Sequence, residues 1–537
     1  MLIAAVDIGT SSTRALLFDG ARFTGHSAAV EYALKSPVPG AAELDPMEVM
    51  NALAECLSAL AQPATHPIEC VALSAAMHSL MAVDARGAPL TALYTWADNR
   101  ASVILPVFEE SLPPTVSSQS LYLETGVPLH PMSPLLKLVW LRHTQPGLFA
   151  AADKFVSIKE FVCHQLFGRW VADHSIASAS GLYSLKQRDW CDAALTTAGV
   201  TRAQLSALAA PETVLQGLPP GYAAAMNLSA ATPFVLGASD GCLANLGAGV
   251  LADQHDEALC SGGAAAPQAT QATHPRSPHR TRRAVLTIGT SGALRMAVPA
   301  PATDTAMRTF CYTLTQNQFV IGGATNGGGL PLRWLRDNFP QLRIGLEAGD
   351  AYSALATLAQ QVPPGAGGLL FHPYLAGERA PLWNADARAS FIGLNFSHGP
   401  AHLVRAVMEG VLFNLAMILD VLEELAGAPV DEIVAGGGFA HSPFWLQMAA
   451  DLLGRPLSVA GNPESTAQGA ALLALKAMGR AASLADAAAA LPPHSRRVLP
   501  DAAAHARYAK LKPIFNGVPA TLAPFYSKLA AFQRQAM

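Results

Sequence analysis

The stretch Asp7-Ile-Gly-Thr-Ser-Ser-Thr-Arg14 contains a turn, Gly9–Thr13, that separates two apolar stretches of the chain, residues 2–8 and 14–18. Apolar β-forming residues on both sides of a Gly/Ser/Thr turn predict a strand, a tight turn and a second strand. The pattern returns in Ile288-Gly-Thr-Ser291, which echoes Ile8-Gly-Thr-Ser11 and again lies between apolar stretches. We interpret the two turns as the sign of a duplicated lobe.

Strands and helices alternate along the rest of the chain. We expect strands at residues 69–74, 79–84, 90–96, 233–237, 431–435 and 456–460, and helices at residues 401–425 and 442–453. This alternation is typical of the α/β class.

Composition excludes several classes of protein. Of the 537 residues, 51% are hydrophobic and 14% are charged, so the chain can bury a core and is not a disordered, highly charged one. The net charge of −4 lacks the basic surplus that nucleic-acid binding needs. There is no apolar run of about 18 residues that would predict a membrane span. The seven Cys are scattered without a CxxC pair, which predicts a reduced, cytoplasmic protein without a disulfide framework or zinc site.

The first turn has the chemistry of a phosphate-binding loop. Small residues let backbone N–H groups approach phosphate oxygens, and an acidic residue at the strand end, Asp7, can hold Mg²⁺. An ordinary hairpin is the alternative. The second turn has Thr287 where the first has Asp7, which suits one metal-holding lobe and one phosphate-clamping lobe. Neither turn matches the GxxxxGK[ST] pattern of a Walker A loop.

Two further motifs follow predicted strands. Gly436-Gly437-Gly438 lies between a strand and a helix, where it suits either the close approach of a nucleotide or helix–strand packing. Asp240 stands at the end of a strand, just before Gly241 and a predicted helix. It is either a helix cap or a general base that accepts a hydroxyl proton during phosphoryl transfer.

Together these motifs resemble the FGGY family of carbohydrate kinases over nearly the whole chain. Matching stretches also occur at Gly377-Glu-Arg-Ala-Pro-Leu-Trp383 and Arg405-Ala-Val-Met-Glu-Gly410. Within the family the sequence is most similar to gluconokinases, on these stretches: Ala76-Met-His-Ser-Leu-Met81, Thr95-Trp-Ala-Asp-Asn-Arg100, His130-Pro-Met-Ser-Pro134, Phe310-Cys-Tyr-Thr-Leu314 and Ile321-Gly-Gly-Ala-Thr-Asn-Gly-Gly-Gly329. Xylulokinase-like members share the Met-His and Trp–Asp themes.

The resemblance implies two actin/hexokinase-type (ribonuclease H-like) ATPase lobes around a central cleft. We expect an N-terminal lobe at residues 1–252 that binds the sugar, a C-terminal lobe at 284–537 that binds the nucleotide, and a mobile insertion at 253–283 between them. The insertion has no periodicity and ends in a group of Arg residues, so a binding or regulatory patch is its alternative interpretation.

The resemblance also implies residue roles. Asp240 would be the catalytic base, and Asp7 would lie near Mg²⁺ and the transferring phosphate. Nucleotide contacts would come from the two turns and the glycine stretches: Thr10, Ser11, Ser12, Thr13, Arg14, Gly289, Thr290, Ser291, Gly328, Gly329, Gly436, Gly437, Gly438, Phe439 and Ala440.

The candidates for holding the sugar are His78, Trp96, Asp98 and Arg100. A sugar-acid carboxylate needs a cation or N–H donors, and Arg100 could supply a bidentate contact. The alternative for Arg100 is a structural pair with Asp98. His78 and Trp96 have the alternative of plain core packing.

The predicted activity is ATP- and Mg²⁺-dependent phosphorylation of D-gluconate on its terminal hydroxyl, giving 6-phosphogluconate. The expected partners are a small sugar acid and ATP, without nucleic acid or membrane, in a monomer or homodimer. The alternatives are a kinase for another sugar or polyol such as xylulose, an actin- or chaperone-type ATP switch, and a silent sugar sensor. A chaperone-type switch would need a client-binding domain after the nucleotide motif, but there we expect only a short helical region and a tail at residues 499–537.

Overall fold

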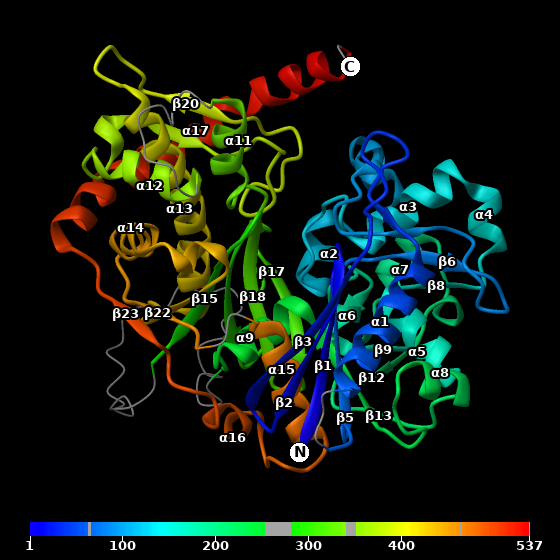
Figure 1. Ribbon diagram of the computed structural model, residues 1–537. Helices are drawn as coiled ribbons and strands as arrows, with labels where there is room; N and C mark the ends of the chain where they lie inside the picture. Colours follow the sequence, from blue (N-terminus) through cyan, green and yellow to red (C-terminus); the bar gives the residue numbers. More distant parts are fainter. Residues whose placement is uncertain (63–65, 253–280, 340–350, 462–463, 536–537) are drawn as a thin grey trace, which may run out of the picture. The chain divides into compact units, whose positions relative to one another are not determined.

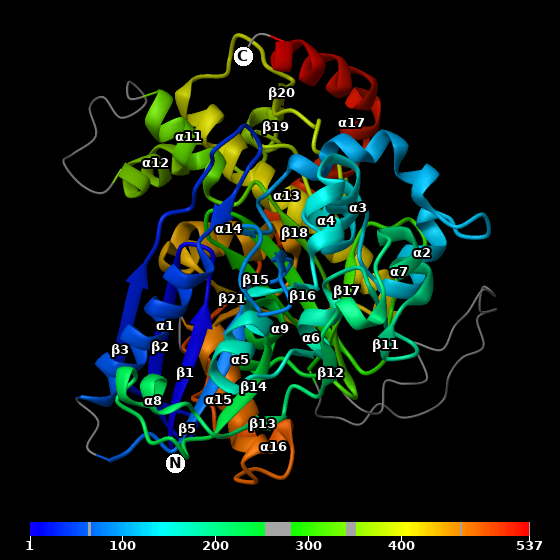
Figure 2. The same cartoon turned by 90° about the vertical axis from the view of Figure 1, so that its right-hand side faces the viewer.

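The computed structural model describes residues 1–62, 66–252, 281–339, 351–461 and 464–535 (Figures 1 and 2). The chain divides into two compact units, neither of which is continuous in sequence. The first unit comprises residues 1–254, 297–321 and 464–492, and the second unit comprises residues 255–296, 322–463 and 493–537. Two segments from the C-terminal half of the chain therefore fold with the N-terminal residues.

A six-stranded sheet forms the centre of the first unit. Its order is β13 (Val214–Leu215), β14 (Phe234–Ser239), β5 (Cys70–Ala75), β1 (Leu2–Ile8), β2 (Ser12–Asp19) and β3 (Arg22–Glu31). Strands β1 and β2 form the predicted antiparallel hairpin, and β1, β5 and β14 run parallel. Most residues of β1, β5 and β14 are buried, as expected for parallel strands covered on both faces.

A seven-stranded sheet repeats this topology. Its order is β17 (Phe310–Thr315), β18 (Gln318–Thr325), β16 (Gly292–Val298), β15 (Arg283–Ile288), β21 (Glu432–Gly436), β22 (Leu457–Val459) and β23 (Arg496–Val498). The hairpin β15–β16 corresponds to β1–β2, and β15, β21 and β22 run parallel as β1, β5 and β14 do. Each sheet also ends in a short antiparallel strand, β13 or β23. The shared topology confirms the duplicated lobe that the two turns predict.

Among the described residues, five two-stranded sheets lie outside the large ones. They are β4 (Glu43–Leu44) with β7 (Leu93–Tyr94), β6 (Met81–Val83) with β8 (Lys154–Val156), β9 (Val171–Asp173) with β12 (Ala207–Ala209), β10 (Tyr183–Ser184) with β11 (Asp189–Trp190), and β19 (Leu370–His372) with β20 (Ser390–Ile392).

Helices cover the sheets. In the first unit they are α1 (Pro46–Ala61), α2 (Ser118–Thr125), α3 (Pro134–Thr144), α4 (Pro146–Ala151), α5 (Ile158–Phe167), α6 (His174–Ser178), α7 (Asp192–Ala198), α8 (Pro220–Ala225), α9 (Asp240–Gly247), α15 (Ser465–Ala477) and α16 (Leu484–Ala489). In the second unit they are α11 (Leu330–Asn338), α12 (Ala351–Gln360), α13 (Pro400–Ala426), α14 (Pro443–Leu453) and α17 (Ala502–Gln535). The 3₁₀ helices are η1 (Arg100–Ser111), η2 (Arg202–Gln204), η5 (Ala366–Gly368) and η6 (Gly438–His441).

Helix α1 illustrates how local sequence builds the core of the first unit. Asp45 caps its N-terminus by accepting a hydrogen bond from the Met47 backbone N–H, and Pro46 occupies the first helical position. The apolar side chains of α1 recur at helical spacing and pack with those of β1, β2 and β5 in one buried cluster. Figure 2 shows α1 lying across this sheet.

The C-terminal segment differs from expectation. Instead of a short helical region and a tail, residues Ala502–Gln535 form α17, which contains Pro513, Pro519 and Pro524. Interior prolines normally argue against a helix, so local propensity does not predict one of this length there. Tyr508 and Phe515 are buried in the second unit, and this packing stabilises α17 where local helix propensity does not.

Candidate active site

The carboxyl ends of the parallel strands in the first unit bring together two of the predicted site residues. Asp7 is near the end of β1, and Asp240 directly follows β14. Strand β5 lies between β1 and β14, with Ser74 in register beside Asp7. In open α/β sheets ligands bind at this edge, so the two carboxylates lie where chemistry is expected.

Asp7 is held in an environment that favours its neutral form. Burial and the negative charge of Asp240 raise its pKa to about 7, although the Ser74 hydroxyl, which donates to Oδ1 at 3.0 Å, lowers it. A divalent cation would relieve this repulsion. In the described ranges, no three His, Cys, Asp or Glu side chains gather into a metal site. A carboxylate such as that of Asp7 is the kind of ligand that Mg²⁺ takes, one or two at a time, together with substrate phosphates.

Asp240 is the first residue of α9 and follows the N-cap residue Ser239. Its Oδ1 accepts the Gly241 backbone N–H at 2.6 Å, and its side chain is partly exposed. Ser239 occupies the N-cap position but makes no capping hydrogen bond with its side chain, so Asp240 satisfies a first-turn N–H from the next position. A carboxylate in the first turn also interacts favourably with the helix dipole.

The hydrogen bonds that hold the end of β14, just before Asp240, were not predicted from the sequence. Lys159 of α5, buried beside β14, donates to the Ala238 backbone carbonyl at 3.1 Å and pairs with Asp173 at 2.8 Å. The Ser239 hydroxyl lies 2.8 Å from the Ser175 hydroxyl. A lone Lys in the run Ile158–Phe167 is the one signal that could have pointed to a buried cation.

The residues of the first turn differ in their exposure to solvent. Thr10 and Ser11 are at least partly exposed, and Arg14 is an exposed partner of Glu464 at 3.4 Å. Ser12 and Thr13 are buried, and the Thr13 hydroxyl lies 3.3 Å from the Tyr32 hydroxyl.

Tyr32, which sequence reasoning missed, fixes this turn from behind. Its hydroxyl donates to the Gly9 carbonyl at 2.6 Å. Thr13 is therefore a structural residue of the turn, because its hydroxyl faces Tyr32.

The second turn is held by the glycine stretch that precedes α11. The Gly329 N–H donates to the Gly289 carbonyl at 2.6 Å, and the Leu330 N–H donates to the Thr290 carbonyl at 3.1 Å. A side chain at Gly328 would collide with the backbone of Ser291. Gly289 and Thr290 themselves remain exposed. The two segments are therefore held together by backbone hydrogen bonds.

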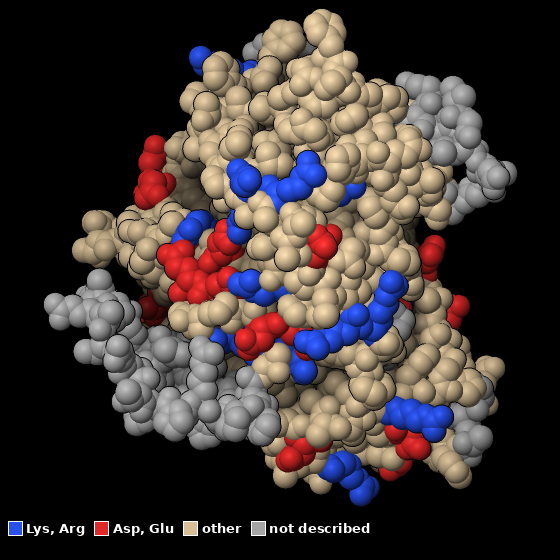
Figure 3. All heavy atoms as spheres, turned by 90° about the vertical axis from the view of Figure 1, so that its left-hand side faces the viewer, with Lys and Arg blue, Asp and Glu red and all other residues tan. Residues whose placement is uncertain are grey.

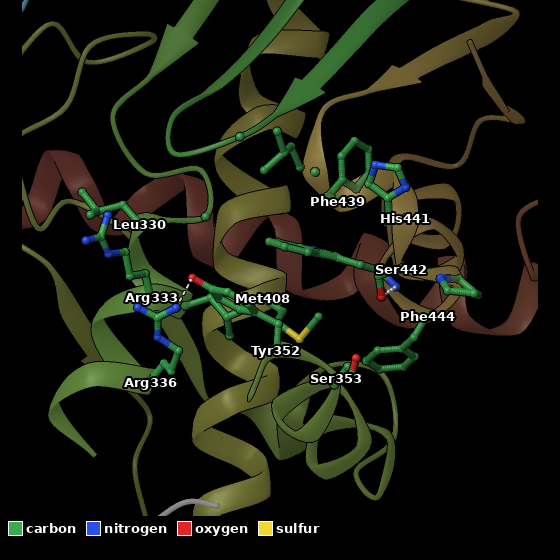
Figure 4. Close-up of a pocket in the computed structure, with 18 of the residues that line it drawn as sticks. Leu330, Arg333, Arg336, Tyr352, Ser353, Met408, Phe439, His441, Ser442 and Phe444 are labelled. Atoms are coloured by element: carbon green, nitrogen blue, oxygen red, sulfur yellow. Dashed lines mark hydrogen bonds between the residues drawn. The ribbon is translucent and has the colours of Figure 1, made fainter. Parts of the chain in front are cut away.

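A cavity of 690 Å³ in the second unit opens beside these segments (Figure 4). Five of the predicted nucleotide residues line it: Gly289, Thr290, Gly329, Gly438 and Phe439. Ser291, Gly328, Gly436, Gly437 and Ala440 do not line it. The size is typical of a site for a cofactor-sized ligand.

Further residues of this cavity were not predicted. Figure 4 shows Arg333 and Arg336 of α11 on one side and the segment from Phe439 to Phe444 on the other. Arg336 donates to the Tyr352 hydroxyl at 3.0 Å and lies over its ring. The half-buried Arg336 pairs with Asp337 at 2.6 Å, and the exposed Arg333 lies 3.6 Å from the same carboxylate. Two Arg side chains thus share one carboxylate, and single Arg residues on a helix give no signal in sequence.

The late glycines have two different functions. Gly437 has φ +84°, and a Cβ there would lie 2.7 Å from the Ile288 carbonyl oxygen, so the turn itself requires glycine. Gly438 has normal backbone geometry, and a Cβ there would meet no atom within 4 Å. Glycine at 438 is thus not needed for folding and leaves room for a ligand.

His78 lies close to Tyr312, a residue that is distant in the sequence. The backbone of His78 has φ +65°, which is uncommon for a residue other than glycine, and such strain often marks a functional position. The ring nitrogen Nδ1 lies 2.8 Å from the Ala179 carbonyl, so Nδ1 carries the proton. The other nitrogen, Nε2, lies 3.4 Å from the Tyr312 hydroxyl. The structure thus joins the Met-His and Phe310–Leu314 stretches.

Trp96 and Arg100 have well-defined partners. The Trp96 indole N–H donates to the Thr10 hydroxyl at 2.9 Å, which ties it to the first turn. The Arg100 guanidinium pairs with Asp98 and Glu43, each at 2.6 Å, and lies over the rings of Tyr94 and Trp140.

These contacts favour the structural-pair interpretation of Arg100. Asp98 is 1% exposed and also accepts the Ala42 backbone N–H at 3.1 Å. The charge of Arg100 is compensated by two carboxylates, so a sugar acid would not meet an uncompensated cation there.

The predicted insertion falls largely outside the described residues, which resume at 281. Arg283 is the first residue of β15 and pairs with Glu432 at 2.9 Å, so the C-terminal end of the predicted segment belongs to the sheet. Arg282 donates its backbone N–H to Asp431 at 2.7 Å.

One face of the molecule carries side chains of both charges. Figure 3 shows one face on which acidic and basic side chains are interspersed, without one continuous basic area. In the parts of the chain that are described, no helix is long and apolar enough to cross a membrane. The six described Cys residues are buried free thiols.

Comparison with known proteins matches two regions of the chain. Residues 2–247 match the N-terminal domain, and residues 284–478 the C-terminal domain, of the FGGY family of carbohydrate kinases. A gluconokinase from Bacillus licheniformis is 38% identical, and the alignment covers 98% of both chains. A xylulose kinase from Escherichia coli (strain K12) is 27% identical over 97% of this chain and 99% of its own.

A solved structure leads to the same family. The crystal structure of gluconate kinase from Lactobacillus acidophilus is 30% identical, with a TM-score of 0.87 over 98% of this chain and 99% of its own. Both the sequence and the repeated sheet topology agree with a two-domain kinase of the actin/hexokinase-like type. The chain belongs to the FGGY family of carbohydrate kinases and is a sugar-kinase phosphotransferase.

Proposed function

We propose that this kinase transfers the γ-phosphoryl group of ATP to the terminal hydroxyl of D-gluconate, giving 6-phosphogluconate, ADP and a proton. The observation that carries the proposal is the 38% identity to a gluconokinase over nearly the whole chain, against 27% to a xylulose kinase. The sugar-side stretches around His78, Trp96 and Tyr312 support the same assignment.

In this proposal, the first unit supplies the acid–base chemistry. Asp240 accepts the proton of the acceptor hydroxyl as the oxygen attacks phosphorus, a contribution of about 10²–10⁴-fold in rate. Asp7 would hold Mg²⁺, which supplies charge neutralisation on the phosphates when it is bound. The Ser74 hydroxyl keeps the Asp7 carboxylate oriented by donating to Oδ1.

The cavity of the second unit receives the nucleotide. The exposed Gly289–Thr290 turn is the candidate for phosphate contacts, and Gly438 leaves room for close approach. Arg333 and Arg336 on α11 line the cavity and share one carboxylate, Asp337, so they add one net positive charge. The backbone bonds from Gly329 and Leu330 to the turn keep the turn in place before the ligand binds.

The acceptor is proposed to bind at the first unit through His78 and Trp96. The contact of His78 Nδ1 with the Ala179 carbonyl places a proton on Nδ1, so in the neutral imidazole Nε2 can accept a hydrogen bond from a sugar hydroxyl or from Tyr312. Trp96 offers a ring surface next to the first turn, where Thr10 fixes its orientation. Asp98 and Arg100 are proposed to shape this segment rather than to bind the carboxylate.

A second candidate, phosphorylation of xylulose or another polyol, is supported by the E. coli relative. A coupled ADP-release assay with gluconate, xylulose, ribulose and glycerol distinguishes the two, with D240N as the inactive control. We expect kcat/KM for gluconate to exceed the others by about tenfold or more, a difference of roughly 1.4 kcal/mol. Activity confined to an uncharged acceptor would overturn the gluconate assignment and leave the family unchanged.

A further inference from the structure

Lys137 is a buried cation in the apolar helix α3. Its side chain is 1% exposed, and its neighbours in the sequence are Leu136 and Leu138. It forms no ion pair with any described residue. A buried ammonium group without a carboxylate partner is costly, so its hydrogen bonds must explain why it is there.

Those hydrogen bonds go to three backbone carbonyls from three separate segments. The Lys137 Nζ lies 2.8 Å from the His78 oxygen, 2.7 Å from the Thr95 oxygen and 2.7 Å from the Met132 oxygen. An ammonium group has three N–H donors, so each carbonyl receives one. Charge-assisted bonds of this kind are about twice as strong as neutral ones.

The three segments are the ones that carry the proposed acceptor residues. The first includes His78 itself, at its uncommon positive φ. The second continues directly from Thr95 into Trp96, whose indole contacts Thr10. The third, residues 130–134, leads into α3. One side chain thus fixes the spacing of three loops whose sequence positions are far apart.

The electrostatic surroundings of Lys137 fit this arrangement. Burial lowers its pKa to about 7, Asp98 opposes this shift and Arg100 adds to it. The imidazoles of His78 and His130 belong to the contacted segments. The three carbonyls favour the ammonium form, because a neutral amine has only two N–H groups.

We propose that Lys137 is a positioning residue for acceptor binding, which holds the His78, Thr95 and Met132 loops in the geometry that the sugar requires. This inference rests on the proposed function only in placing the acceptor at His78 and Trp96. Lys137 acts through backbone carbonyls and does not touch the acceptor.

The test compares K137M and K137R with K154M. Lys154 also donates Nζ to backbone carbonyls, of Ala203 at 2.7 Å and of Leu205 at 3.4 Å, but these belong to none of the three segments. All variants are assayed with the acceptor that the wild-type enzyme uses best, so that failure on gluconate would refute the proposed function without affecting this test. KM for the acceptor, KM for ATP and kcat are measured on the folded fraction, determined by circular dichroism.

We expect K137M to raise the acceptor KM about tenfold or more, with the ATP KM within about twofold of wild type. K137R keeps the charge and the N–H donors and should recover part of the acceptor KM. K154M should match wild type in both KM values. An unchanged acceptor KM in folded K137M, or an equal rise in both KM values, would overturn the proposal. If K137M does not fold, K137R serves as the test. A raised acceptor KM with an unchanged ATP KM in K137R supports the proposal, and wild-type values of both KM contradict it.

Discussion

Asp7 and Asp240 stand at the carboxyl ends of β1 and β14, on either side of β5, and the charge of Asp240 raises the pKa of Asp7. Two carboxylates arranged in this way suit a division of labour, with one holding a cation and the other accepting a proton.

Asp240→Asn should lower kcat by about 100-fold or more, because an amide cannot accept the hydroxyl proton. The KM for ATP should stay within about twofold, since the cavity proposed for the nucleotide lies in the second unit. Asp192→Asn is a matched control, because Asp192 is likewise the first residue of a helix, α7. Steady-state kinetics of both variants check this, and near-normal turnover in D240N would remove Asp240 from its assigned role.

Asp7→Asn should abolish most activity and stabilise the metal-free protein above pH 7. In the unfolded chain Asp7 ionises near pH 4, whereas in the folded chain its pKa is about 7. The unfolded state therefore binds fewer protons between these values, and this group makes the folded state progressively less stable as pH rises from about 4 to about 7.

Thermal unfolding in EDTA measures the difference. D7N should unfold a few degrees above wild type at pH 8, and the gap should close towards pH 4. Asp19→Asn, at a side chain that is 73% exposed, is the control and should show no such gain. An equal Tm for D7N and wild type at pH 8 would contradict the raised pKa.

Arg100→Lys should destabilise the first unit by about 1–3 kcal/mol, because Lys cannot make the fork with Asp98 and Glu43 or stack as a plane on Tyr94 and Trp140. Urea unfolding measures this. The ratio of kcat/KM for gluconate to that for xylulose should stay within about twofold. A selective loss on gluconate would instead assign Arg100 to the carboxylate.

Gly438→Ala should raise the ATP KM about fivefold or more without loss of stability. The added methyl group meets no protein atom within 4 Å, so only a bound ligand would feel it. Gly517→Ala, whose added Cβ is equally unobstructed, is the control and should leave the ATP KM unchanged. If G438A binds ATP as wild type does, the nucleotide does not approach this glycine.

The sequence predicted much of the fold, because the strongest signals were local. The two Gly-Thr-Ser turns predicted two hairpins, and both exist as β1–β2 and β15–β16. Helix α13 was expected at residues 401–425 and is Pro400–Ala426. These elements have the regular apolar spacing and turn residues that specify them without distant help.

Long-range relationships could not be predicted in this way. Nothing near His78 indicates that Tyr312 will face it, and the hydrogen bonds of Lys137 depend on where three loops meet. Helix α17 was missed because its prolines oppose helix formation and its stability comes from tertiary packing. The Asp98–Arg100 pair shows a different limit, since the sequence offered both interpretations and Glu43 favours the structural one.

The most direct measurement of the central claim is a competition in one reaction. Purified enzyme with Mg²⁺ and limiting ATP is given equal concentrations of D-gluconate and D-xylulose, and the two phosphorylated products are quantified by mass spectrometry. Their initial ratio equals the ratio of kcat/KM values. We predict 6-phosphogluconate in at least about tenfold excess; an excess of phosphorylated xylulose would contradict the account.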